Sequence, residues 1–154
     1  MPSPNLALKV RLPELNDSHD IFQWRNDEDT RRMSFDQSVI SLASHQLWFA
    51  NALANPSKKL IVAESNDQKV GVVRFDYLEP GYALVSINLN PLCRGKGLSA
   101  AVLVKSEALL FSDIRQLIAE IKPENASSKK TFARAGYTFA QINGDAEIYI
   151  KTLN

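Results

Sequence analysis

Two glycines and two cations lie together at Arg94-Gly95-Lys96-Gly97, between a short apolar run and a long one. Glycines let the backbone pass close to a ligand with several N–H groups pointing inward. The apolar run that follows is expected to form a helix, and a helix N-terminus carries unpaired N–H groups and about half a positive charge. The stretch therefore predicts a cradle for phosphate groups, with Arg94 and Lys96 adding charge at its rim.

The spacing of the glycines separates this loop from two common phosphate-binding motifs. The GxxxxGK[ST] spacing is absent, and Gly95 and Gly97 have no third glycine for a GxGxxG motif. The pattern is R-x-x-G-x-S, formed by Arg94, Gly97 and Ser99. It resembles the pyrophosphate-binding loop Q/R-x-x-G-x-G/A of the GNAT superfamily of acyl-CoA-dependent N-acyltransferases. Ser99 replaces the usual glycine or alanine, but serine is small and can donate a hydrogen bond to phosphate.

A second segment strengthens the resemblance. Glu124 to Tyr137 resembles the second cofactor motif of that superfamily, N-x-x-[SA]-x-x-x-[YF]-x-x-x-G-[FY]. Leu89-Asn90-Pro91 resembles the end of its splayed fourth strand, whose backbone pairs with the pantetheine arm. The resemblance implies that acetyl-CoA binds here as the acyl donor. The cofactor-binding residues that it implies are Leu89, Asn90, Arg94, Gly95, Lys96, Gly97, Leu98, Ser99, Asn125 and Ser128.

The resemblance implies attack of an amine on a thioester carbonyl. In the family a backbone N–H of the fourth strand, here near Leu89, stabilises the oxyanion. The position at which the family often has a tyrosine acid is Phe132, which cannot donate a proton. The family transfers the acyl group directly, so Cys93 is expected to be a bystander. The candidate catalytic residues are Ser86, which could order a water molecule, Glu79, for which a plain surface carboxylate is the alternative, and Tyr137, which lies at a position normally occupied by a core residue.

The segment Trp24–Phe35 carries groups suited to a polar, anionic acceptor. Guanidinium groups can pair with carboxylate or phosphate, and indoles can stack on a sugar or base. The runs W-R-N-D-x-x-x-R-R and H-x-x-W-F-x-x-x-L-x-N-P resemble the GNAT branch that acetylates amino groups of nucleotide-linked amino sugars. A ribosomal-protein or peptide N-terminal acetyltransferase and a non-catalytic acyl-CoA-binding module are the alternatives. The predicted acceptor-binding residues are Trp24, Arg25, Asn26, Arg31 and His45, although the tryptophan could be a core residue and the histidine could be a surface residue at a helix start.

Apolar periodicity predicts the elements that would position these residues. Two helices are expected early in the chain, one after the cap residues Asn16–Ser18 and one ending before Asn55-Pro56, and a strand–helix–strand unit from Tyr82 to Lys122 implies a mixed sheet. We therefore expect an α/β (α+β) fold, GNAT-like, with a mixed, mostly antiparallel central sheet of about seven strands flanked by about four helices. A single domain is expected to span residues 1–154. The expected strands are Leu6–Leu12, Lys58–Ser65, Lys69–Leu78, Tyr82–Asn90, Gln116–Lys122, Tyr137–Ala140 and Glu147–Thr152, and the two later helices are Leu98–Phe111 and Asn125–Ala135.

The amino-acid composition argues against several classes of binding partner. The 154 residues include 18 Lys and Arg against 17 Asp and Glu, so no global basic field attracts nucleic acid or an anionic membrane. One cysteine and two histidines argue against a metal site. The first residues lack the pattern of a signal peptide. We expect a cytoplasmic monomer or homodimer that acts on a small-molecule amine, with no metal, nucleic-acid or membrane partner.

Overall fold

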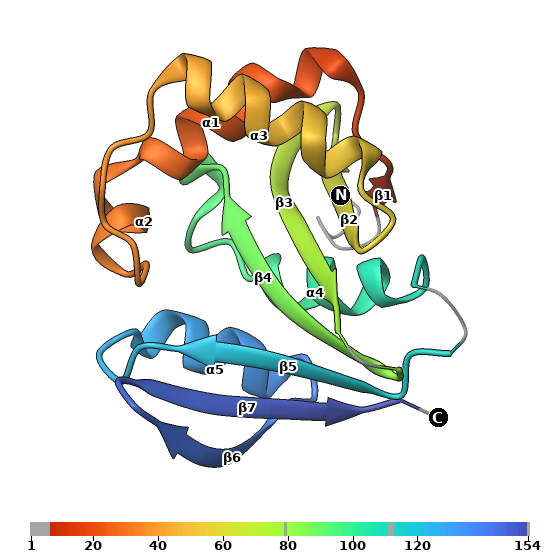
Figure 1. Cartoon of the computed structure of the whole chain (residues 1–154), viewed down its shortest axis with the longest axis vertical. Coiled ribbons are helices and arrows are strands. Elements are labelled where there is room, and N and C mark those ends of the chain that lie inside the picture. Colours follow the sequence, from red (N-terminus) through yellow and green to blue (C-terminus); the bar gives the residue numbers. More distant parts are fainter. Residues whose placement is uncertain (1–6, 79, 111–112, 154) are drawn as a thin grey trace.

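The computed structural model describes residues 7–78, 80–110 and 113–153 of the chain. Its strands form one seven-stranded sheet in the order β1-β2-β3-β4-β5-β7-β6 (Figure 1). Neighbouring strands pair antiparallel, except for β4 and β5, which pair parallel. The strands are β1 (Leu8–Arg11), β2 (Lys58–Ser65), β3 (Gln68–Tyr77), β4 (Tyr82–Leu89), β5 (Gln116–Ile121), β6 (Thr138–Asn143) and β7 (Ala146–Thr152).

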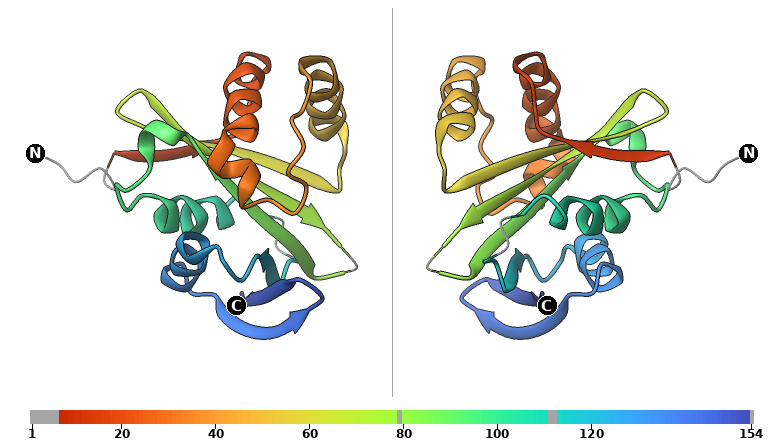
Figure 2. Two further views of the ribbon diagram at one scale, coloured as in Figure 1. Left: turned by 90° about the vertical axis from the view of Figure 1, so that its left-hand side faces the viewer. Right: turned by 90° about the vertical axis from the view of Figure 1, so that its right-hand side faces the viewer.

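Helices cover both faces of the sheet, α1 and α3 on one side and α4 and α5 on the other (Figure 2). Alternating side chains of the strands point to opposite faces, so each face has its own apolar core. Ile21 and Phe49 pack with Val72 under α1 and α3, whereas Val73 packs with Val102 under α4. The helices are α1 (Ser18–Asn26), α2 (Glu28–Arg32), α3 (Leu42–Ala54), α4 (Ser99–Glu107) and α5 (Ala126–Arg134), with short 3₁₀ helices η1 (Leu15–Asp17) and η2 (Pro91–Cys93).

The predicted mixed, mostly antiparallel sheet of seven strands is confirmed, and the helices differ in two details. Helix α2 is additional, and it forms because the Asp27 side chain caps it by accepting from the Thr30 backbone N–H at 3.1 Å. Helix α4 ends at Glu107 instead of Phe111, because tighter bonds such as that from Leu110 N–H to the Glu107 carbonyl close its last turn. Phe111 itself lies outside the described residues.

Strands β4 and β5 separate along their length. Their pairing runs from Tyr82 opposite Gln116 to Leu84 opposite Ile118, and from there the two strands diverge (Figure 1). The backbone of β4 from Val85 to Leu89 pairs with β3 on one edge and has no partner strand in the described structure on the β5 side. The sheet therefore opens in the middle and leaves a β-strand edge with free hydrogen-bonding groups.

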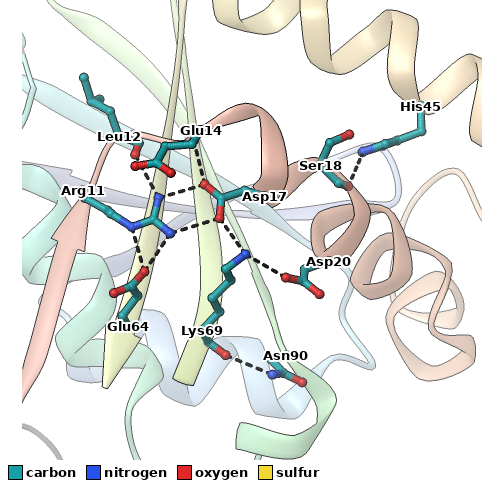
Figure 3. Close-up of polar contacts among 10 residues, drawn as sticks. All are labelled: Arg11, Leu12, Glu14, Asp17, Ser18, Asp20, His45, Glu64, Lys69 and Asn90. Carbon is teal, nitrogen blue, oxygen red and sulfur yellow. Dashed lines mark hydrogen bonds and ion pairs between the residues drawn. The ribbon is translucent and has the colours of Figure 1, made fainter. Parts of the chain in front are cut away.

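A buried charge cluster fixes the start of α1 against the sheet (Figure 3). The Asp17 side chain, 1% exposed, pairs with Arg11 of β1 at 2.8 Å and with Lys69 of β3 at 2.8 Å. Arg11 also pairs with Glu64 of β2, and Lys69 with Asp20 of α1. One network of ion pairs thus joins three strands and a helix.

No helix in the described ranges is long and apolar enough to cross a membrane. The cytoplasmic location stays a prediction.

Candidate active site

A cavity of about 910 Å³ occupies the opening beside the separated part of β4. Its wall is formed by β4 residues Val85 to Leu89, by the glycine loop before α4, by the start of α5 and by the α2 region. The volume is typical of a site for a sizeable ligand. Six basic and three acidic side chains line it, although the whole chain is nearly neutral. They are Arg25, Arg32, Arg74, Arg94, Lys130 and Arg134 against Asp29, Asp36 and Glu124.

The glycine loop brings backbone N–H groups to this cavity. Gly95 and Gly97 adopt positive φ angles of 74° and 70°, and a Cβ added at either one would meet no protein atom within 4 Å. Their backbone is therefore open toward the cavity, and residues other than glycine would be strained there. Helix α4 begins directly afterwards, and no side chain caps its first turn. The first N–H groups of α4 are thus free to bind an anion.

The second predicted motif lies across the same cavity. Asn125 caps α5, where its side-chain oxygen accepts from the Ser128 N–H at 3.1 Å. The hydroxyls of Ser99 and Thr131 are 2.8 Å apart, which joins the start of α4 to the middle of α5. The two segments that the sequence pattern singled out therefore meet at one site.

Contacts at its base hold the glycine loop in place. Asn90 donates from its side chain to the Lys69 carbonyl at 2.9 Å (Figure 3), and its side-chain oxygen accepts from the Leu92 N–H. Cys93 is buried below the loop, and burial raises the pKa of its thiol. Lys69 belongs to the Asp17 cluster, so the loop is tied through β3 to the charge network of the fold.

Arg94 connects the loop to the α1–α2 corner. Its guanidinium bonds to the Asp27 carboxylate and, at 2.9 Å, to the Thr30 hydroxyl. Burial raises the pKa of Asp27, but the hydrogen bonds from Arg94 and the Thr30 backbone outweigh it and hold this pKa below its usual value. The charge predicted for the rim of the cradle is therefore partly neutralised by α2 in this structure.

A second group of polar residues lies on the wall formed by β3 and β4. Arg74 pairs in register with Ser86, and Val72 with Asn88, so these side chains share the sheet face covered by α1 and α3. Arg25 of α1 reaches the same place. Ser86, a predicted catalytic residue, is exposed to the cavity, where it lies opposite an arginine instead of a carboxylate.

Arg25 is held by neighbours from α3. Its guanidinium lies 4.3 Å from the centre of the Trp48 ring, and Nη1 is 3.3 Å from His45 Nδ1. His45 Nε2 is 2.9 Å from the Ser18 carbonyl (Figure 3), which can only accept, so Nε2 carries the proton and Nδ1 accepts from Arg25. Burial lowers the pKa of His45, which favours this neutral form. His45 is fully buried and supports Arg25 without lining the cavity.

The other predicted acceptor-binding residues make structural contacts. Trp24 is 5% exposed and belongs to the apolar core with Phe49. Asn26 clamps Ile40, donating to its carbonyl at 2.7 Å and accepting from its N–H at 2.8 Å. Arg31 donates to the carbonyls of Asn26 and Gln37. Of the predicted acceptor-binding set, the structure brings Arg25 to the cavity wall and places the other four away from it.

Some of the predicted catalytic and cofactor-binding residues line the cavity, and others do not. Tyr137 is buried beside Phe132, where burial raises the pKa of its phenol, and it does not line the cavity. Glu79 lies outside the described residues. Of the predicted cofactor-binding residues, Asn90 and Lys96 are not part of the wall. Those that line it are Leu89, Arg94, Gly95, Gly97, Leu98, Ser99, Asn125 and Ser128.

Sequence reasoning missed Arg74 and Asn88 as site residues. A signal was present, because Arg74 interrupts the apolar run KVGVVRF of a predicted buried strand. Its position opposite Ser86 depends on the register of β3 against β4, which the local sequence pattern of Arg74 does not give. In the described part of the chain no cluster of ligating side chains could hold a metal ion.

Comparisons with known proteins agree with this geometry. The chain is 25% identical over 128 residues to the uncharacterized N-acetyltransferase YfmK of Bacillus subtilis strain 168, covering 82% of each chain. Its fold is similar to the aminoglycoside acetyltransferase AAC(6')-Ib in complex with coenzyme A (TM-score 0.80, 19% identity, 94% of each chain covered). It is also similar to the spermidine N-acetyltransferase of Vibrio cholerae in complex with CoA and spermine (TM-score 0.83, 15% identity, 96% of each chain covered).

The model of a protein family matches most of the chain. Residues 7–138 match the acetyltransferase (GNAT) domain, which includes the glycine loop, the separated strand and the start of α5. The match confirms the predicted fold and the predicted enzyme class, an acetyl-CoA-dependent N-acetyltransferase. The chain therefore belongs to the acetyltransferase (GNAT) domain family.

Proposed function

We propose that the protein transfers the acetyl group of acetyl-CoA to the primary amine of a small acceptor that carries an anionic group, with a nucleotide-linked amino sugar as the candidate acceptor. The amine attacks directly while both substrates are bound. One observation carries the proposal: the free edge of β4, the open glycine loop and the basic β3–β4 wall border a single cavity.

The donor half of the site fits a long, anionic thioester. The glycine loop and the uncapped start of α4 suit a pyrophosphate, because the space beside Gly95 and Gly97 is open and no side chain occupies the first N–H groups of α4. The free edge of β4 can hydrogen-bond an amide-containing arm as an added strand would. The structural neighbours named above hold coenzyme A, which supports the same use of this fold.

The charge of the acceptor half favours an anion. Arg25 and Arg74 reach the wall near Ser86, and no described side chain of β4 in that wall is acidic. A polyamine or an aminoglycoside carries several positive charges, which two arginines would repel. Although the similar enzymes act on aminoglycosides and spermidine, the acceptor proposed for this chain has the opposite charge.

The chemistry needs little from ionisable side chains. The amine must arrive neutral and lose one proton as its nitrogen bonds to the carbonyl carbon, while the C–S bond breaks and the thiolate leaves. Two polar side chains of β4, Ser86 and Asn88, line the cavity, and we assign to Ser86 the ordering of a water molecule that accepts this proton. Cys93, whose raised pKa keeps it a thiol, does not serve as a nucleophile in this proposal. Positioning of the two substrates supplies the main rate enhancement.

Two alternatives predict different results. A peptide N-terminal acetyltransferase would use peptides better than sugars, and a non-catalytic module would bind acetyl-CoA without turnover, which the phenylalanine at position 132 would suit.

The test is acetyl transfer measured by thiol release and product mass. Acetyl-CoA would be offered with UDP-linked amino sugars, short peptides, spermidine or no acceptor. The highest kcat/KM is expected for a UDP-linked amino sugar. A higher kcat/KM for peptides or for spermidine would show that the proposed acceptor is wrong. Binding of acetyl-CoA without turnover of any amine would contradict the enzymatic role.

A further inference from the structure

We propose that Arg25 and Arg74, with Ser86 and Asn88, form an oxyanion subsite that binds the phosphate or carboxylate of the acceptor and so selects anionic amines over cationic ones. The inference rests on the proposed function, because it assigns a part of the same cavity. Of these four residues, Arg74 and Asn88 are new, and they come from strands that the sequence alone could not align.

The four polar groups converge on a small recess of about 30 Å³ that joins the larger cavity. Arg74 and Ser86 are direct cross-strand partners, and Asn88 lies two residues further along the same face of β4. Arg25 enters from α1, above that face. Residues with guanidinium, hydroxyl and amide donors therefore line one recess, and an oxyanion is the group that accepts from all of them.

Arg25 is rigidly prepared for such a ligand. Its guanidinium stacks on Trp48 and donates one hydrogen bond to His45 Nδ1. These two contacts fix the orientation of the guanidinium and leave its other N–H groups for a ligand. Among the described residues no carboxylate lies within 4.0 Å of its guanidinium. Burial and the nearby charge of Arg74 lower its pKa, whereas Asp36 raises it. Asp36 is exposed and accepts instead from Ser38 N–H and hydroxyl.

Arg74 is anchored at one end only. Its Nε lies 3.2 Å from Asp76 Oδ2, close enough for an ion pair, and Asp76 also pairs with Lys58 at 2.9 Å. Its terminal nitrogens make no hydrogen bond in the described structure, and Arg74 lines the recess. Two guanidinium groups held this close repel each other, and an anion between them removes that repulsion. The charge of Arg74 beside Arg25 therefore favours an oxyanion as the ligand of this recess.

The chemistry of the subsite also gives selectivity. A guanidinium binds a phosphate or a carboxylate through two parallel hydrogen bonds, which lysine cannot reproduce. An acceptor with its anion in this recess would have its remaining length directed along β4, toward the free edge beside which the thioester end of the donor is proposed to lie. Phosphate from a nucleotide and carboxylate from an amino acid share this chemistry, so the two sources must be separated by experiment.

The test measures binding of unreactive anions in the presence of saturating CoA, which fills the donor site. UDP is titrated by calorimetry into the wild type, Arg25→Gln, Arg74→Gln and Arg74→Lys. Arg115→Gln is the charge-matched control, because Arg115 is exposed and does not line either cavity. Thermal unfolding checks that each variant is folded. Inorganic phosphate and acetate, added as competitors of UDP, distinguish the phosphate source from the carboxylate source.

We expect UDP affinity to fall at least tenfold in both glutamine variants and to stay within twofold in the control. Arg74→Lys should lose most of the affinity as well, because it keeps the charge but not the planar fork. Stronger competition by phosphate assigns the subsite to phosphate, and stronger competition by acetate assigns it to a carboxylate.

Equal UDP affinity in the wild type, Arg25→Gln and Arg74→Gln would overturn the subsite. If the same preparations acetylate an amine, the proposed function stands without it. If the variants lose UDP but no amine is ever acetylated, the subsite stands and the enzymatic proposal fails.

Discussion

At the scale of single residues, Phe132 occupies the position where the family often has a tyrosine. It is 3% exposed, lies edge-on to Tyr137 with ring centres 4.9 Å apart, and lines the cavity. A thiol has a pKa near 8.5, so its thiolate is a good leaving group without prior protonation. We therefore expect Phe132→Tyr to change kcat less than about threefold with the best acceptor. Steady-state kinetics at saturating acetyl-CoA measure it, and a rise of tenfold or more would mean that protonation limits the native enzyme.

His45 is the residue whose protonation state matters most for the fold. Burial lowers its pKa, and the nearby Arg25 adds to the shift against the Ser18 hydrogen bond. The unfolded chain then binds a proton more readily than the folded one, so stability falls as pH drops below about 6.5. His45→Gln should remove part of this acid sensitivity.

Urea unfolding at pH 7.5 and 5.5 tests this prediction. The loss of unfolding free energy between the two values should be smaller in His45→Gln than in the wild type. His19→Gln, at the exposed histidine, is the control and should keep the wild-type loss. An identical loss in all three proteins would show that His45 titrates alike in both states.

At the scale of elements, the glycine loop gives a matched pair of substitutions. Gly97 and Gly144 both have positive φ angles, 70° and 64°, and both have open space where a Cβ would point. Gly97 lines the cavity before α4, whereas Gly144 lies in the turn between β6 and β7. A glutamate therefore costs similar backbone strain at either position, but only at position 97 does it place a side chain and a negative charge in the phosphate cradle.

We expect Gly97→Glu to reduce CoA affinity by at least a hundredfold and Gly144→Glu to leave it within twofold. Isothermal calorimetry gives both values, and thermal unfolding should show a similar fall in Tm for the two variants. Wild-type affinity in folded Gly97→Glu would remove the donor site from this loop.

The elements themselves were largely predictable, and their relative placement was not. Short apolar runs bounded by turn residues predicted β2, β3 and β4 within one or two residues, because both features are local signals. The cap that creates α2 depends on Asp27, which looked like one charge among several. The pairing of Arg74 with Ser86 depends on register, and the neutral state of His45 depends on Ser18, 27 residues away. Contacts between distant segments therefore decided which predicted residues reach the cavity.

At the scale of the whole molecule, charge is unevenly distributed. A net charge of +1 hides a cavity with twice as many basic as acidic side chains. Three of the 17 acidic residues, Asp17, Asp20 and Glu64, lie instead in the cluster around Asp17 that joins β1, β2, β3 and α1 (Figure 3). Composition could exclude a global anion-binding field, but it could not reveal a local one. The same cluster is connected to the proposed donor site, because the Lys69 carbonyl accepts a hydrogen bond from Asn90 at the base of the glycine loop.

Asp17→Asn tests that link together with the stability of the fold. Burial raises the pKa of Asp17, but hydrogen bonds from Arg11, the Glu14 N–H and Lys69 outweigh it and hold this pKa well below its usual value. Asp17 therefore stabilises the fold fully above about pH 4 to 5, and this contribution is lost as pH falls below its unfolded value of about 3.9. At pH 7 the variant should lose roughly 3 kcal/mol of unfolding free energy, the lower end for breaking a buried pair.

Asp20→Asn is the matched control for this change. Asp20 also pairs with Lys69 at 2.8 Å, but its side chain is 41% exposed, so its loss should cost about 0–1 kcal/mol. Urea unfolding at pH 7 and at pH 3 gives the free energies, and the difference between wild type and Asp17→Asn should shrink at the lower pH. Calorimetry on the folded variants should show weaker CoA binding in Asp17→Asn than in Asp20→Asn, because a looser start of β3 also loosens the loop anchored on it. If the two variants are equally stable at pH 7, the prediction is wrong: hydration of Arg11 and Lys69 then compensates for the loss of their ion pairs with Asp17.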